Sequence, residues 1–244
     1  MLKKYISLHI YPKLALWILL GFIGFTIVGT LTHELGHIAF AKAFGYKTHL
    51  GYGYMNYYDS PFSIEFDTIT ARNQDAIASN RDFPEKEHLD TLVEKLKFSS
   101  FLITLGGPLQ TIISGTVGFA FLCSWRRRIR EYGMKLKDWI FVFISLFWLR
   151  QLANPVTGLM RSIAKGGFNP FGGHSDELVL ARHLGWWEGS ISLPLALIAF
   201  GIAIYVIFKI LPKPVRFTFI SAGFIGGVLG YMIWLVWIGP VVMP

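Results

Sequence analysis

Long apolar runs dominate the chain and predict how it is organised. Four of them carry no charged residue: Leu14–Leu31, Phe98–Trp125, Gly189–Phe208 and Phe217–Pro244. A helix needs roughly 20 apolar residues to cross a hydrocarbon core about 30 Å thick. Each run is therefore predicted to be a transmembrane helix.

A fifth segment, Trp139–Met160, is apolar but is interrupted by Arg150, Gln151 and Asn154. Polar residues at bilayer depth are tolerated when they face the interior of a helix bundle. We therefore count this segment as a span. The prediction is an all-α integral membrane protein, a bundle of about five transmembrane helices forming one polytopic domain over residues 1–244.

Composition agrees with a membrane protein. The chain is 53% hydrophobic and 16% charged, whereas soluble domains carry about a quarter charged residues. The net charge of +8 does not indicate nucleic-acid binding, because the basic residues are clustered in short segments between the apolar runs. One cysteine, Cys123, excludes an intrachain disulfide. The partners expected are the lipid bilayer and a membrane protein substrate, with no nucleic acid, and the sequence does not indicate an oligomeric state.

The basic clusters predict orientation. They precede the first span and separate spans two from three and four from five: Lys3, Lys4 and Lys13, then Arg126–Lys137, then Lys209–Arg216. With five spans these clusters share one side, which the positive-inside rule makes cytoplasmic. The N-terminus is expected in the cytoplasm. Its apolar stretch is too long for a signal peptide and is expected to be retained as a helix.

Residues 48–97, between the first two spans, form an insertion of different character. Residues 51–58 are aromatic, Asp59-Ser60-Pro61 is a turn signal, and Phe62–Asp67 alternates apolar and polar residues. This pattern predicts a β-hairpin over Gly51–Asp67, with an irregular interfacial loop as the alternative. The charged stretch Arg81–Lys97 is expected to be a solvated helix or loop.

The strongest chemical signal is His33-Glu34-Leu35-Gly36-His37, inside the first predicted helix. Histidines at i and i+4 lie about 5–6 Å apart on a helix, so both imidazoles can bind one Zn²⁺. Glu34 can then serve as general base toward the zinc-bound water. Ionisable groups are costly in a membrane helix, which argues against a chance match.

A catalytic zinc usually has three protein ligands, so one must come from elsewhere. With the predicted topology, the segment after the third span lies on the same side as the end of the first. It contains His174 and Asp176 as candidates, and Glu177 as a weaker one. A helix cap at Ser175 or Asp176 is the competing structural interpretation.

The chain resembles the site-2 protease family of intramembrane zinc metallopeptidases. The resemblance is carried by HELGH, by Gly106-Gly107-Pro108-Leu109-Gln110 and by Asn169-Pro170 followed by Ser175-Asp176. It implies a zinc-dependent endopeptidase and favours Asp176 over His174, because an aspartate completes the site in that family. The family's usual Leu-Asp-Gly motif is absent, which suggests a compact, divergent branch.

Three further expectations concern substrate binding. The resemblance implies that an extended segment, here Gly51–Asp67, aligns substrate as an added strand. Gly106, Gly107 and Pro108 are predicted to break the second helix and contact substrate, or alternatively to form a packing kink. The third span contributes three polar candidates: Arg150, Gln151 and Asn154. They could stabilise the oxyanion of the reaction intermediate, orient the metal ligands, or form a structural hydrogen-bond network between helices. Of the three, Asn154 is assigned to substrate binding.

Together these features predict an intramembrane zinc protease whose site lies toward the extracytoplasmic side. The alternatives are a zinc hydrolase or transferase acting on a lipid-linked substrate, or a metal-stabilised scaffold. A scaffold site would normally be closed by four ligands and would have no use for Glu34.

Overall fold

The computed structural model describes residues 8–171 and 173–244; the predicted basic residues Lys3 and Lys4 lie outside them. Within these ranges five helical segments are long and apolar enough to cross a membrane: Pro12–Ala43, Lys86–Tyr132, Leu136–Ala164, Gly189–Ile210 and Lys213–Val242. The predicted all-α membrane fold with five spans is confirmed.

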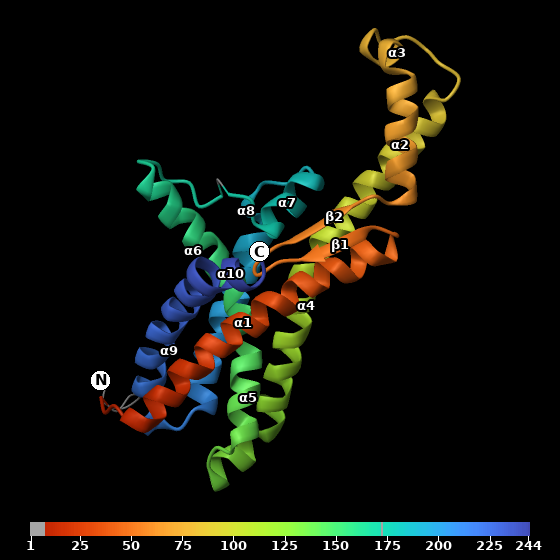
Figure 1. Cartoon of the computed structure of the whole chain (residues 1–244). Coiled ribbons are helices and arrows are strands. Elements are labelled where there is room, and N and C mark those ends of the chain that lie inside the picture. Colours follow the sequence, from red (N-terminus) through yellow and green to blue (C-terminus); the bar gives the residue numbers. More distant parts are fainter. Residues whose placement is uncertain (1–7, 172) are drawn as a thin grey trace.

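The elements follow one another along the chain as shown in Figure 1. Most spans are longer than their apolar runs, and three contain a change of helix type. In chain order they are α1 (Pro12–Ala43), β1 (Lys47–Leu50), β2 (Met55–Tyr58), α2 (Pro61–Arg72), α3 (Gln74–Ala78), α4 (Lys86–Tyr132), α5 (Leu136–Ser145), the 3-10 helix η2 (Leu146–Trp148), α6 (Leu149–Ala164), α7 (Asp176–His183), α8 (Gly189–Tyr205), the π-helix η3 (Val206–Ile210), the 3-10 helix η4 (Lys213–Val215), α9 (Arg216–Tyr231), the π-helix η5 (Met232–Ile238) and α10 (Gly239–Val242).

α1 crosses α4 in direct backbone contact. A Cβ added to Gly36 would lie 2.4 Å from the carbonyl oxygen of Gly106, and one added to Gly106 would lie 2.4 Å from that of Gly36. Small residues allow such close approach of membrane helices. The glycine inside HELGH is thus explained by packing, and it brings the motif against α4.

α4 continues as one helix through Pro108, so the predicted break at Gly106-Gly107-Pro108 is wrong. Proline removes the donor that would bond the carbonyl of residue 104, but neighbouring helices support a membrane helix at such a point. The break in the bundle occurs instead in the third span, where η2 joins α5 to α6.

The main apolar core lies between α1, α4, α5, η3 and α9. Its buried members include Ile18, Leu122, Val142, Val206 and Phe219. The basic stretch between the second and third spans lies where α4 ends and α5 begins, and there Arg128 pairs with the fully buried Asp138. The cytoplasmic placement of this stretch stays a prediction.

The hairpin after the first helix is confirmed, but its strands were misplaced. β1 pairs antiparallel with β2, with Lys47 opposite Tyr58 and Leu50 opposite Met55. The predicted second strand, Phe62–Asp67, is instead the first half of α2. Ser60 caps this helix through a capping box with Ser63, and Pro61 occupies its first turn, both of which favour a helix start.

α2 and the first turns of α4 form an arm that extends away from the bundle (Figure 1). Ile69, Leu89 and Leu92 make a small core of its own. The charged stretch Arg81–Lys97 is part of this arm, and it is helical from Lys86 onward, as the start of α4. The arm leaves the hairpin beside the end of α1 that carries the histidine pair.

Candidate metal centre

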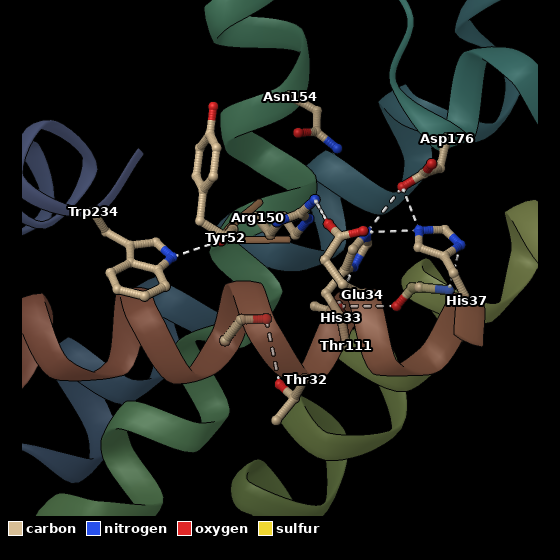
Figure 2. Close-up of polar contacts among 12 residues, drawn as sticks. Thr32, His33, Glu34, His37, Tyr52, Thr111, Arg150, Asn154, Asp176 and Trp234 are labelled. Atoms are coloured by element: carbon tan, nitrogen blue, oxygen red, sulfur yellow. Dashed lines mark hydrogen bonds and ion pairs between the residues drawn. The ribbon is translucent and has the colours of Figure 1, made fainter. Parts of the chain in front are cut away.

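The histidine pair lies on the buried face of α1. His33 and His37 are 0% and 7% exposed, although α1 is a long apolar helix with few buried positions. Their Nε2 atoms are 3.2 Å apart, as the i and i+4 spacing predicts. Figure 2 shows both rings directed away from α1 toward Asp176.

Asp176, the first residue of α7, completes the group. Its Oδ2 atom lies 2.9 Å from Nε2 of His33 and 3.5 Å from Nε2 of His37. In the part of the chain that the structure describes, these three residues form the group able to hold a metal ion. His174 borders the same cavity but does not join them, and Ser175 makes no side-chain cap to α7.

The other ring nitrogens are held by α4. Nδ1 of His33 lies 2.8 Å from the hydroxyl of Thr111, which donates in turn to the carbonyl of Gly107. Nδ1 of His37 lies 2.6 Å from the carbonyl oxygen of Ile103. A carbonyl only accepts, so the 2.6 Å contact places the ring proton of His37 on Nδ1 and outweighs the longer 3.3 Å approach of the Gly107 N–H to the same nitrogen. The Thr111 proton is already donated to Gly107, so Nδ1 of His33 carries its ring proton as well. Both Nε2 lone pairs therefore face Asp176.

These three atoms fit a divalent cation. Two imidazole lone pairs and a carboxylate oxygen converge with no proton between them, which is unfavourable unless a cation sits among them. Metal bonds of 2.0–2.1 Å in tetrahedral geometry place ligand atoms about 3.3 Å apart, close to the three distances above. The nitrogen and oxygen donors suit Zn²⁺, and the backbone and hydroxyl contacts supply the outer support typical of zinc histidines.

Gly107 makes room for this group. A Cβ at position 107 would lie 2.2 Å from Nε2 of His37 and 2.6 Å from Nε2 of His33, closer than real Cβ contacts. The glycine therefore leaves open the space beside the Nε2 atoms of both histidines. Gly106, Gly107 and Pro108 are all buried and none borders the cavity, which favours packing over the predicted substrate contact.

Gly107→Ala is accordingly expected to abolish zinc binding, because the added methyl group occupies the space between the two Nε2 atoms. Elemental analysis of purified protein would measure the loss. Gly227→Ala is the matched control, since a Cβ there meets nothing within 4 Å. Normal zinc content in Gly107→Ala would show that the histidines do not bind metal through Nε2.

Glu34 lies beside the three ligand atoms without joining them. It is 5% exposed, and its Oε1 atom is 3.9 Å from Nη2 of Arg150. In Figure 2 the carboxylate lies between Arg150 and the histidine pair. Glu34, His37, Arg150 and Asp176 border a cavity of about 340 Å³, open to solvent and edged by hairpin residues 53–55 and 57.

Asn154 connects α6 to the start of α7, beside Asp176. Its Nδ2 donates to Oε2 of Glu177 at 2.9 Å, and Glu177 is fully buried next to Asp176. Burial, with the Asp176 charge adding to it, raises the pKa of Glu177 above its ordinary value. Asn154 also borders the cavity, so its predicted contact with substrate stays a prediction. Gln151 is buried and does not reach the cavity.

Sequence reasoning missed the supporting residues on α4. Thr111 and the carbonyl of Ile103 orient the two rings, but neither belongs to a motif, and a backbone carbonyl carries no side-chain signal.

The chain has no significant match among protein-family models, curated proteins or solved structures.

Proposed function

We propose that this chain is an intramembrane zinc peptidase that hydrolyses a peptide bond in a membrane-embedded or juxtamembrane segment of another protein. One observation carries the proposal. Three atoms able to bind a metal ion, from His33, His37 and Asp176, converge beside the carboxylate of Glu34, which is not one of them.

This arrangement favours catalysis over a structural role. Structural zinc sites are generally closed by four protein ligands, whereas catalytic sites keep a position open. Among the described residues the group has three members, and its open side faces the cavity. Glu34 would serve no purpose in a scaffold, where a buried carboxylate costs free energy.

The residues divide the work of hydrolysis. When bound, Zn²⁺ would polarise the substrate carbonyl and lower the pKa of water. Glu34 takes one proton from the attacking water as the new C–O bond forms at the carbonyl carbon. The C–N bond then breaks, and Glu34 passes that proton to the leaving nitrogen. The products are a carboxylic acid and an amine, with no other reactant needed.

The hairpin supports a peptide as the substrate. Met55 and Tyr57 of β2 border the cavity together with Glu34 and His37. Within residues 8–171 and 173–244, β2 pairs only with β1, which leaves one backbone edge available. An extended peptide can bind such an edge by added-strand hydrogen bonds. A helical substrate must unwind before its peptide bond is accessible, and hydrogen bonds to the edge of β2 would replace those lost from the helix.

The position of the site along α1 supports cleavage near a membrane surface. His33 follows Pro12 by 21 residues, or about 32 Å along an α-helix, similar to the thickness of the hydrocarbon core. The metal site thus lies toward the end of the span opposite the basic end. The motifs that resemble site-2 proteases are consistent with this activity.

The proposal can be tested in vesicles containing the purified protein and a synthetic peptide with roughly 20 apolar residues flanked by lysines. We expect two complementary fragments by mass spectrometry. They should disappear with phenanthroline, return with Zn²⁺, and be absent with His33→Ala. The same fragments from His33→Ala would contradict the proposal. Intact peptide together with hydrolysed phospholipid would favour a lipid hydrolase instead.

A further inference from the structure

Arg150 is a second charged group at the cavity, on α6. Its side chain is 32% exposed, it borders the cavity with Glu34 and Asp176, and its Nε atom is buried without a hydrogen-bond partner. The guanidinium carries five N–H donors in a rigid planar fork. Few of these donors are used in the structure.

The cost of this residue calls for a compensating role. Placing arginine at the centre of a membrane helix costs about 2.5–3.5 kcal/mol on insertion scales, and such residues usually mark function. The ion pair with Glu34 offsets little of this cost, because its 3.9 Å separation is too long for a hydrogen bond. Nor does a structural network offset it, since the neighbouring Gln151 side chain is also without partners.

The geometry points to Arg150 as the catalytic residue that binds the carbonyl oxygen of the scissile peptide as it becomes an oxyanion; this assignment rests on the proposed peptidase function. Glu34 lies between Arg150 and the histidine pair (Figure 2). A carbonyl group placed over Glu34 for attack by water is therefore flanked by the metal ligands on one side and the guanidinium on the other.

Asn154 is less suited to this role, although it also borders the cavity. Its amide nitrogen already donates to Glu177, which ties it to α7. Among the described residues Arg150 has the ion pair with Glu34 but no hydrogen bond, and η2 and α6 fix the start of its side chain on a rigid element. Preorganised donors of this kind act on charge that develops in the transition state and affect the substrate ground state little.

Arg150→Met and Arg150→Lys test the assignment. With the vesicle substrate, Arg150→Met should lower kcat by about 10²–10³-fold, as loss of an oxyanion donor does, with little change in KM. Its affinity for a phosphinic peptide, which mimics the tetrahedral oxyanion, should fall by a similar factor. Affinity for a hydroxamate, which requires only the metal, should be kept. Arg150→Lys should recover part of both losses, and Arg161→Met on the exposed side of α6 is the matched control.

Each outcome decides the assignment. Unchanged phosphinate affinity in Arg150→Met would overturn it, whatever happens to kcat. Parallel losses of zinc, hydroxamate and phosphinate binding would also overturn it and make Arg150 a structural residue. If the wild-type protein binds hydroxamate but cleaves no peptide, the peptidase function fails separately, and phosphinate affinity alone decides whether Arg150 binds an oxyanion.

Discussion

Glu34→Gln is expected to reduce peptide hydrolysis by at least about 10²–10⁴-fold, the usual contribution of a general base, while zinc stays bound. Glutamine keeps the size of the side chain and loses the carboxylate that accepts the proton. The three ligand atoms belong to other residues, so metal binding should survive. The measurements are the rate of fragment formation and the zinc content of the same preparation.

The carboxylate's position explains why the effect should be large. Glu34 is nearly buried, and Arg150, 3.9 Å away, is the cation nearest to it among the described ion pairs. Bulk water cannot substitute for Glu34, because water is a far weaker base than a carboxylate. The neutral amide of glutamine is likewise too weak a base to take a proton from the attacking water.

Glu131→Gln is a suitable control, because Glu131 is an exposed carboxylate at the far end of α4. It should leave both zinc content and hydrolysis unchanged. An unaltered rate in Glu34→Gln, with zinc bound, would refute the general-base role and favour a scaffold. Uncleaved substrate that co-purifies with Glu34→Gln could be identified directly by mass spectrometry.

The membrane spans and the histidine pair could be predicted because both depend on local sequence. Leu14–Leu31 predicts a span by its length alone, and the structure extends it into the helix Pro12–Ala43. The i and i+4 spacing then brings His33 and His37 together on any regular helix. Neither inference requires knowing which helices pack against one another.

The hairpin was misplaced because a short alternating run is ambiguous. Phe62 and Phe66 read as one face of a strand, yet they also fall at the i and i+4 positions of a helix, where they pack near Ile69. The Ser60 capping box and Pro61 decide for the helix. By sequence alone the same residues indicate a turn, since these residue types favour both turns and helix starts.

The contacts around the metal site could not be predicted from sequence. The role of Gly107 depends on the crossing of α1 and α4, and the orientation of both imidazoles depends on Thr111 and the Ile103 carbonyl of α4. These are tertiary contacts between residues more than 60 positions apart. The choice between His174 and Asp176 was open for the same reason, since it depends on how α7 packs.

Removing Asp176 should therefore discriminate between the two candidates. Asp176→Ala deletes the oxygen that lies 2.9 Å from His33 and 3.5 Å from His37. Losing a direct ligand should weaken zinc binding by more than the 10–100-fold typical of losing an outer-layer partner, and hydrolysis should be lost with it. Competition with a chromogenic chelator would measure the affinity.

His174→Ala is the matched variant, two residues away in the same segment and at the edge of the same cavity. It should retain zinc with wild-type affinity, because its ring is not part of the convergent group. If His174→Ala releases the metal and Asp176→Ala keeps it, the ligand assignment is wrong. If both keep it, two histidines alone hold the ion. Loss in Asp176→Ala only would establish Asp176 as the third ligand and make the metal site dependent on the position of α7, which packs against α4 and α8. The Asn154–Glu177 hydrogen bond would then contribute to metal affinity without contacting the metal.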